Sequence, residues 1–333
     1  MKKAYVLRSS NVTVTSFVFD IFFDALIECK YETTNCFLVS EIPNDNKKNV
    51  VVVCDSTLSA FKLLIRGFKR VYVWVQGAWD HESFLNTGSK IKRTAIRLIE
   101  RYVFKRTIHI FFVSKAMKKY YSKNYNMCFN SNTSIIPCFN TTIQLDSFNQ
   151  KKYDDNIFVY AGGTAIWQGL EKIIKVYSFI EKHSNLNTTI LLLVKDKDTC
   201  LNLLGKYEVS NYVINYVSVS ELPKALSIAK FGFIIRDDNI TNNVSTPTKL
   251  STYLSCGVIP IYSSSIHDFA ELASKMNFAI EYSENDLLDK INLFKNIKAN
   301  DVMDEYIGIF NSYYSRTKYK ELIMRVINEN ENH

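Results

Sequence analysis

Glycine, proline and paired cysteines are all scarce in this 333-residue chain, which has only ten Gly and five Pro. So few chain-breaking residues leave no room for a long disordered linker. The seven cysteines include no CxxC pair, and no histidine cluster accompanies them. This spacing argues against a metal site and against a disulfide framework. It predicts a reducing, cytoplasmic compartment.

Long hydrophobic runs are also lacking. The most apolar stretch, residues 17–27, is interrupted by Asp20 and Asp24, and no window approaches the roughly 18 uncharged apolar residues that a spanning helix needs. The amino end starts with two lysines, but its apolar run covers only residues 4–7. That pattern is typical of a first strand rather than a signal peptide. We therefore expect a protein that does not span a membrane.

Two nucleotide-binding motifs are missing as well. No GxxxxGK[ST] loop occurs, and Gly162-Gly163-Thr164 does not fit GxGxxG. Because no acidic residue stands at a strand end about 20 positions further on, a dinucleotide site is not indicated. Glycine after a strand still permits close approach of a ligand to the backbone, although such glycines are also ordinary turn residues.

Positive charge is concentrated in the first half of the chain. Residues 1–148 contain 21 Lys and Arg against 11 Asp and Glu, whereas the remainder contains 20 against 22. A basic domain predicts an anionic partner or a membrane surface, and it is equally typical of a solvated face. Charge is the only feature that favours a nucleic-acid partner, and no motif supports it, so none is predicted.

Short apolar runs alternate with amphipathic segments along the whole chain, which predicts an α/β protein with parallel sheets. The strands are expected at 5–7, 36–39, 50–54, 71–75, 108–113, 134–136, 157–160, 189–194, 212–216, 232–235 and 258–262. The helices are expected at 15–29, 56–66, 89–105, 115–123, 170–182, 197–206, 220–228, 247–256, 286–296 and 301–329.

A polar stretch at 140–156 separates the two α/β halves and is the expected linker. We predict two Rossmann-like domains, an acceptor-side domain at 1–148 and a donor-binding domain at 149–309. The C-terminal helix, from about 310 to 333, is expected to pack back on the first domain. Because open α/β sheets bind ligands at the carboxyl ends of their strands, the active site is expected in a cleft between the two sheets.

The residues around Arg236 predict an anion site. Arg236 follows a buried strand, and Ser245-Thr246-Pro247 are typical of a helix start. Free N–H groups at a helix start bind anions. Lys249 in the first turn opposes the helix dipole, which a bound anion would explain, although a solvated Lys and a surface Arg236 paired with a neighbouring Asp fit the sequence too.

Four blocks in chain order carry a family resemblance. They are Gln76-Gly77-Ala78-Trp79-Asp80-His81-Glu82, the segments 112–117 and 136–138, Val159-Tyr160-Ala161-Gly162-Gly163 with Gln168-Gly169, and Arg236-Asp237-Asp238 with 243–249 and 253–260. Together they resemble the retaining GT-B glycosyltransferases of family four, the glycogen-synthase-like group. The resemblance extends over nearly the whole chain, and its most specific part is the block from Arg236 to Gly257.

The resemblance implies a role for each matching position. It makes Arg236, Lys249 and His81 catalytic. The implied donor-binding residues are Gly163, Thr164, Gln168, Val194, Lys195, Val217, Ser218, Leu222, Ser245, Thr246, Pro247, Thr248 and Thr252. The implied acceptor-side residues are Ser9, Ser10, Asn11, Gln76, Gly77, Trp79 and Asp80.

Three positions depart from the family pattern. Gln168 stands where the family has a basic residue before the glycine, which removes one charge from the diphosphate site. Thr252 replaces the Glu that holds the nucleotide ribose, and Val244 replaces its acidic companion. The sequence therefore predicts contacts to the phosphates more strongly than contacts to the ribose.

The expected function is transfer of a sugar from a nucleotide-sugar, UDP- rather than GDP-linked, to a lipid-linked or surface-polysaccharide acceptor such as lipopolysaccharide or capsule. By the resemblance, the reaction retains anomeric configuration and needs neither metal nor cofactor. The basic first half of the chain and the aromatic-rich residues 17–23 predict that the enzyme works at the cytoplasmic face of the plasma membrane. A non-catalytic nucleotide or glycan binding module of the same fold is the alternative. An epimerase would need cleft carboxylates and histidines that the sequence does not reveal.

Overall fold

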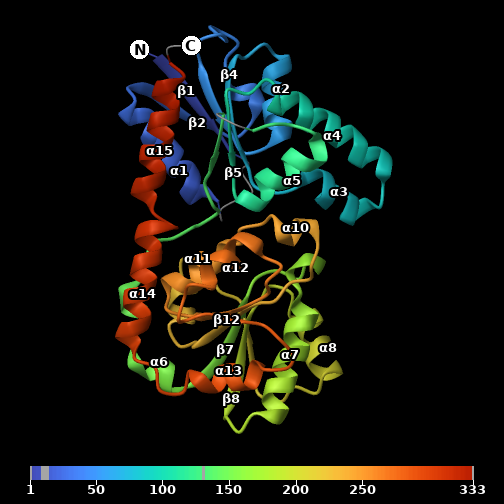
Figure 1. Cartoon of the computed structure of the whole chain (residues 1–333), viewed down its shortest axis with the longest axis vertical. Helices are drawn as coiled ribbons and strands as arrows, with labels where there is room; N and C mark the ends of the chain where they lie inside the picture. Colours follow the sequence, from blue (N-terminus) through green and yellow to red (C-terminus); the bar gives the residue numbers. More distant parts are fainter. Residues whose placement is uncertain (1, 9–14, 130–131, 332–333) are drawn as a thin grey trace. The chain divides into compact units, whose positions relative to one another are not determined.

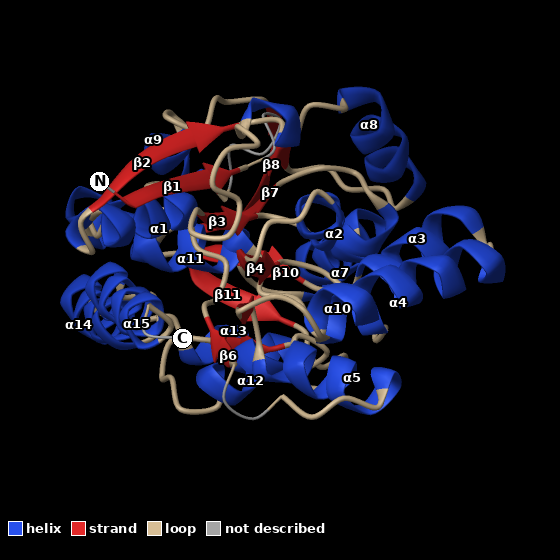
Figure 2. Ribbon diagram, turned by 90° about the horizontal axis from the view of Figure 1, so that it is seen from above, coloured by secondary structure: helices blue, strands red, loops and turns tan. Residues whose placement is uncertain are grey.

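The computed structural model describes residues 2–8, 15–129 and 132–331 of the chain. Its contacts divide the chain into two compact units. The first comprises Met1–Asn140, Asn243–Thr246 and Ser315–His333, and the second comprises Thr141–Asn242 and Pro247–Tyr314. Each unit is built around its own parallel sheet (Figures 1 and 2), and this confirms the predicted α/β class.

The first unit contains six described strands and the helices that connect them. Its strands are β1 (Lys2–Leu7), β2 (Tyr31–Cys36), β3 (Val51–Cys54), β4 (Arg70–Val75), β5 (His109–Phe112) and β6 (Thr133–Ile135). Its helical elements are α1 (Ser16–Glu28), η1 (Val39–Glu41), α2 (Thr57–Ile65), α3 (Trp79–Thr87), α4 (Lys90–Phe104), α5 (Lys115–Tyr125) and α15 (Arg316–Glu329).

The sheet of the first unit has the order β2-β1-β3-β4-β5-β6, and every described pairing is parallel. Strand β3 is buried along its whole length, as expected for a sheet covered on both faces. Trp74 of β4 packs edge-on against Phe19 of α1 at 5.3 Å between ring centroids, and its indole N–H donates to the carbonyl of Ile136. Aromatic packing therefore fixes α1 against the sheet.

Serine side chains cap three of the connecting helices. Ser56, Ser89 and Ser114 accept N–H groups from the first turns of α2, α4 and α5, respectively. Such caps satisfy donors that a helix start leaves unpaired and contribute about 1 kcal/mol each. Ser114 directly precedes the helix expected at 115–123, and the structure places its side chain at the start of α5.

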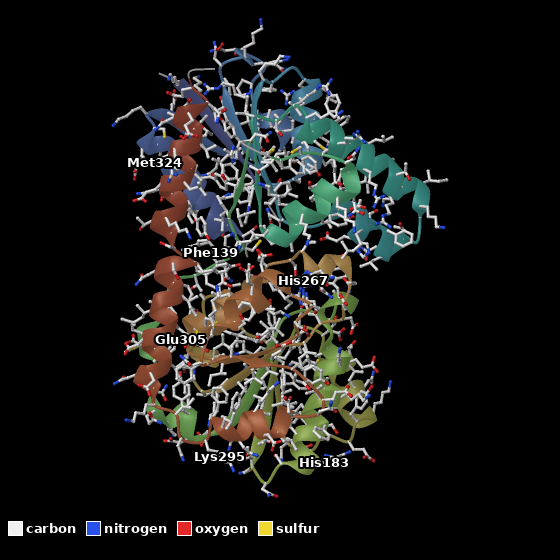
Figure 3. The ribbon with its side chains drawn as sticks, viewed as in Figure 1. Phe139, His183, His267, Lys295, Glu305 and Met324 are labelled. Atoms are coloured by element: carbon white, nitrogen blue, oxygen red, sulfur yellow. The ribbon has the colours of Figure 1, made fainter. Side chains whose placement is uncertain are left out.

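Helix α15 lies beside α1 in the first unit, although almost 300 residues separate them in the chain (Figure 1). Arg316 pairs with Asp24 at 2.6 Å, and Lys320 pairs with Glu28 at 2.5 Å. Further along, the Cys29 thiol lies 3.9 Å from the carbonyl of Met324, a residue marked on α15 in Figure 3. The last helix thus completes the first unit rather than the second.

The second part of the chain supplies the other sheet. Its strands are β7 (Asn156–Ala161), β8 (Thr188–Leu193), β9 (Tyr212–Asn215), β10 (Phe231–Ile234), β11 (Ile259–Tyr262) and β12 (Ile280–Glu281). Its helical elements are η2 (Leu145–Ser147), α6 (Gln150–Asp154), η3 (Ile166–Gln168), α7 (Leu170–His183), α8 (Lys197–Lys206), α9 (Leu222–Leu226), α10 (Ile240–Asn243), α11 (Thr248–Ser255), α12 (His267–Ala273), α13 (Leu287–Leu293) and α14 (Ala299–Ser312).

The order of the second sheet, β12-β11-β10-β7-β8-β9, places a topological switch point between β7 and β10. From β7 the chain proceeds toward β9 on one side, and from β10 it proceeds toward β12 on the other. Phe158 of β7 stacks on Phe231 and Phe233 of β10 in the core. Because ligands of open α/β sheets bind where the strand order reverses, the carboxyl ends of β7 and β10 are the place to look for a site.

Several predicted boundaries were wrong, each for a local reason. The second strand is Tyr31–Cys36, an edge strand with mostly polar residues, so it lacks the apolar run that was sought. The expected linker at 140–156 contains η2 and α6. The expected helix at 301–329 is two helices, because the chain turns at residues 313–315 and Ser315 caps α15 anew.

Candidate functional site

The glycine turn after β7 lies at the switch point of the second unit. Gly163 N–H donates to Gln168 Oε1 at 3.2 Å, and Tyr160 OH donates to the Gly163 carbonyl at 2.5 Å. Gly169 has a positive φ of 70°, and a Cβ there would lie 2.4 Å from the carbonyl oxygen of Ile235. Glycine at 169 is therefore required for the turn to pack against the end of β10.

Lys249 lies against this turn. Its Nζ donates to Gln168 Oε1 at 2.7 Å and to Tyr160 OH at 3.1 Å, and it lies 4.2 Å from the centroid of the Tyr160 ring. A Cβ on Gly162 would come within 2.1 Å of Nζ, so any other residue there would displace the ammonium group from this position. The residue that replaces the family's basic group, Gln168, is thus the residue that positions Lys249.

Arg236 follows β10 and lies on the same carboxyl edge. Its backbone N–H donates to Ser263 Oγ at 2.6 Å, and its guanidinium donates to Asn242 Oδ1 at 3.3 Å. Burial lowers the pKa of Arg236 to about 10, whereas Tyr160 acts in the opposite direction. The side chain stays charged at neutral pH despite its burial.

Burial also lowers the pKa of Lys249 well below its usual value, and the positive charge of Arg236 lowers it further. Among the described residues, none with a carboxylate forms an ion pair with Lys249. Burial and the neighbouring charge of Arg236 both make the protonated form of Lys249 costly, and a bound anion would offset that cost. The pair therefore forms an electropositive site suited to a phosphate group.

The start of α11 differs from the prediction. The residue at the cap position is Pro247, not Ser245 or Thr246, and the proline side chain makes no capping hydrogen bond. Thr246 is unavailable because its Oγ1 accepts the backbone N–H of Cys138 at 2.9 Å within the first unit. Thr248 begins the helix, so Lys249 lies in the first turn of α11, where backbone N–H groups have no partner within the helix.

Two family departures have a local explanation in the helix and its preceding segment. Thr252 is buried on α11, and its hydroxyl donates to the carbonyl of Thr248 at 3.0 Å. The carbonyl of Val244 accepts a hydrogen bond from Ser114 Oγ, and the Val244 side chain is buried. Neither residue supplies a carboxylate for a ribose, and the predicted donor role of Thr252 stays a prediction.

The remaining donor-side predictions fall on loops after β8 and β9. Val194 is buried and donates its N–H to the Asn215 carbonyl, whereas Lys195 is exposed. Ser218 is exposed, and its hydroxyl donates to Glu221 Oε2 at 2.7 Å. Ser218 therefore binds Glu221, which occupies the cap position of α9. Val217 lies in the same loop, and Leu222 is the first residue of α9.

Three of the seven predicted acceptor-side residues line a pocket of the first unit. The cavity has a volume of about 310 Å³ at the carboxyl ends of β3 and β4, and its lining includes Gln76, Gly77 and Trp79. It also includes two carboxylate residues, Asp55 and Glu82. Burial raises the pKa of Glu82, and the nearby charge of Asp80 raises it further.

Asp80, in contrast, is not placed to meet an acceptor. Its side chain is fully buried, and its carboxylate accepts from Arg93 at 3.1 Å, from Arg97 at 2.9 Å and from Tyr120 at 2.8 Å. Such a network holds α3, α4 and α5 together, so the structure assigns Asp80 to stability. His81 is half-buried outside the pocket lining, and burial and then Arg93 lower its pKa.

Ser9, Ser10 and Asn11 lie outside the described residues. Sequence reasoning missed Tyr160, Asp55 and Glu82. A tyrosine directly before the glycine turn was visible as a signal, because its hydroxyl can reach over a short loop. No comparable signal distinguished Glu82 from Asp80.

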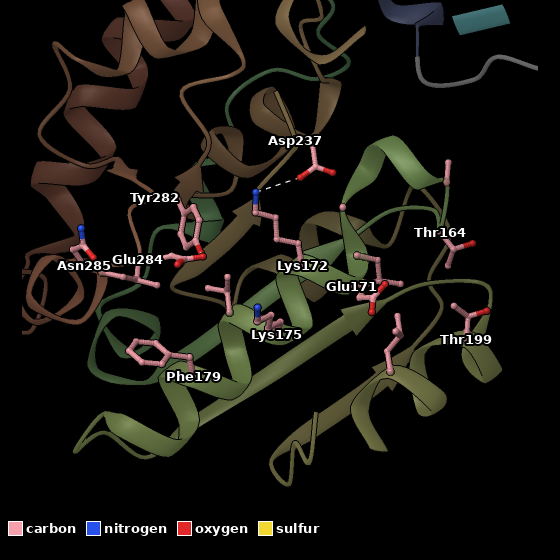
Figure 4. Close-up of a pocket in the computed structure, with 16 residues that line it drawn as sticks. Thr164, Glu171, Lys172, Lys175, Phe179, Thr199, Asp237, Tyr282, Glu284 and Asn285 are labelled. Carbon is pink, nitrogen blue, oxygen red and sulfur yellow. Dashed lines mark hydrogen bonds and ion pairs between the residues drawn. The ribbon is translucent and has the colours of Figure 1, made fainter. Parts of the chain in front are cut away.

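A cavity of about 920 Å³ runs along α7 (Figure 4). Its lining includes neither Arg236 nor Lys249. Its polar lining includes Thr164, Lys172, Asp237 and Tyr282, and Lys172 pairs with Asp237 at 3.3 Å. Only Thr164 of the predicted donor residues borders it. We therefore centre the site on the cation pair, where the charges converge.

No cluster of three or more His, Cys, Asp or Glu side chains suited to a metal occurs among the described residues. One Asp-x-Asp spacing exists in the sequence, at Asp196 and Asp198. Asp196 accepts the N–H and the hydroxyl of Thr199 as the cap of α8. Within the described residues, no helix combines the length and the apolar character needed to cross a bilayer.

The sequence matches no protein-family model and no curated protein, whereas several solved structures are similar. Sucrose-phosphate synthase from Thermosynechococcus elongatus gives a TM-score of 0.68 at 11% identity, covering 98% of this chain and 100% of its own. An alpha-glucosyltransferase in complex with UDP and DNA gives 0.59 at 14% identity, covering 97% and 99%.

TarM gives a TM-score of 0.63 at 15% identity, and the match covers 87% of this chain. The chain spans 56% of the length of TarM. At these identities the likeness establishes the fold, and it confirms the predicted GT-B architecture of two α/β units.

Proposed function

We propose that the protein is a glycosyltransferase that uses a nucleotide-sugar, UDP-linked rather than GDP-linked, and that Arg236 and Lys249 hold its diphosphate. The observation that carries the proposal is the convergence of these two cations at the switch point of the second sheet. Lys249 is fixed there by Gln168 and Tyr160. The known binding of UDP by structures of similar fold, such as the alpha-glucosyltransferase, supports the nucleotide class.

In the proposed mechanism, Arg236 and Lys249 of the second unit stabilise the leaving group by their positive charge, and no residue of this unit acts as a nucleophile. When the sugar leaves the donor, the nucleoside diphosphate gains negative charge. A fixed ammonium and a fixed guanidinium stabilise that charge more strongly at the transition state than in the ground state. The proposal includes retention of configuration, with the acceptor proton passing to the leaving phosphate, and no metal.

The pocket at Gln76, Trp79 and Glu82 is the proposed acceptor site. Carboxylates accept hydrogen bonds from sugar hydroxyls, and side-chain amides both accept and donate them. An indole ring offers an apolar face for a pyranose. We propose a lipid-linked or surface-polysaccharide acceptor, and the basic first half of the chain supports work at a membrane surface. Glu82 takes the place near the acceptor that was expected for Asp80 or His81.

The experiment is a thermal-shift panel of UDP, GDP and CMP and their sugars, followed by assay of nucleotide release with acceptor extracts. We expect stabilisation by one nucleoside diphosphate and turnover of its sugar. A thermal shift without turnover would favour the non-catalytic binding module. Thr252 is the feature that motivates this alternative, because it stands where the family has a ribose-binding Glu. If no nucleotide shifts the melting temperature and no sugar nucleotide is turned over, the proposed function is refuted.

A further inference from the structure

Helix α4 carries an outward apolar stripe bordered by basic side chains. Ile91 is 85% exposed and Leu98 is 66% exposed. Residues seven apart on a helix differ by only about 20° in direction, so the two side chains project from the same face. Ala95, also exposed, and half-buried Tyr102 fall on that face between and beyond them.

Basic residues flank this stripe on both sides. At about 100° per residue, Lys92 lies to one side, whereas Arg101 and Lys105 lie to the other, and all three are exposed. The single acidic residue of α4, Glu100, points inward and is buried with Tyr121 and Tyr125 as hydrogen-bond partners. The outer face of α4 thus carries positive charge and apolar surface without a negative charge.

The inner face of α4 is fixed to the first unit. Arg93 and Arg97 pair with buried Asp80, and Ile96, Val103 and Phe104 are buried. These contacts leave the outer stripe as a preformed surface. A solvent-exposed isoleucine and leucine in line on one helix need an explanation other than packing.

We propose that the outer face of α4 docks on an anionic lipid bilayer. Lys and Arg beside an apolar stripe match both parts of such a surface, because the headgroups attract the cations and the stripe enters the boundary with the acyl chains. A DNA duplex would complement only the charge. This proposal names the surface by which the proposed glycosyltransferase would bind a membrane. It rests on the proposed function only for the biological role of that binding.

The test is flotation of the 333-residue chain with vesicles of phosphatidylcholine alone or mixed with phosphatidylglycerol. We expect binding to the mixed vesicles, weakened by salt. The double variant Ile91→Gln/Leu98→Gln should partition about tenfold or more weakly. The double variant Lys92→Gln/Arg101→Gln should lose about fivefold in partitioning for each charge removed. Because these side chains are exposed, the thermal melts of both variants should match the wild type.

A matched control is Leu293→Gln, which removes a 79%-exposed leucine from α13 in the second unit and should leave flotation unchanged. The proposal is overturned if the wild type does not bind the mixed vesicles, or if the α4 variants bind them as strongly as the wild type does. Salt-dependent binding to a DNA oligonucleotide that the Ile91→Gln/Leu98→Gln variant retains, without vesicle binding, would assign the surface to nucleic acid instead. Nucleotide-induced thermal shifts on the same variants test the proposed function separately.

Discussion

Lys249 is the residue whose replacement separates a binding role from a structural one. It sits with its ammonium group between Gln168 and Tyr160, close to Arg236, and no carboxylate offsets its charge among the described residues. The variant Lys249→Met keeps most of the side-chain volume and removes the charge. We predict that it weakens nucleotide binding without weakening the fold.

The expected loss of binding follows from the contact that Lys249 would make. A hydrogen bond to a charged group contributes about 1.5–3 kcal/mol, which corresponds to a dissociation constant about 10- to 100-fold higher. The expected effect on the fold has the opposite sign. Removing a buried ammonium relieves a desolvation cost, so the melting temperature should stay equal or rise, by about 2–4 °C for each kcal/mol regained.

The assay is isothermal titration of the nucleoside diphosphate that the wild type binds, together with thermal melts without ligand. Lys206→Met is the matched control, because it removes an exposed lysine whose ion pair with Glu171 contributes little. If Lys249→Met binds the nucleotide as tightly as the wild type, the assignment of the phosphate site is wrong. A large fall in the melting temperature of Lys249→Met would instead show that Lys249 stabilises the folded state.

Three further predictions concern buried groups and the glycine turn. Asp80→Ala should cost about 3 kcal/mol in urea unfolding, because it leaves two arginines without their buried partner, and a loss below about 1 kcal/mol would contradict this. Burial raises the pKa of Glu100 to about 8, although its hydrogen bonds with tyrosines lower it. Between about pH 4.5 and 8 the folded state therefore keeps a proton that the unfolded state loses, so the free energy of unfolding should fall as pH rises through this range. Glu100→Gln should flatten that fall, and an unchanged slope in urea titrations at several pH values would exclude Glu100 as its source. Gly169→Ala should destabilise by more than about 1 kcal/mol, because an alanine at positive φ is strained and its Cβ meets a carbonyl oxygen, and a wild-type melting curve would contradict the turn geometry.

The periodicity of the chain was enough to predict two parallel α/β units, because continuous apolar runs such as residues 50–54 can only be buried on both faces of a sheet. It also marked Arg236 as the end of a buried strand. These features depend on short stretches of sequence, whose patterns report directly on burial. Polar edge strands such as Tyr31–Cys36 carry no such pattern and escaped notice.

The tertiary structure decided which polar groups meet. Lys249 and Gln168 are 81 residues apart, and only the packing of α11 against the glycine turn brings them within 2.7 Å. Asp80 and Glu82 lie two residues apart on α3, yet one is fully buried with two arginines and the other lines a pocket. Successive residues on a helix point in different directions, and the neighbours against which the helix packs determine which direction is the interior.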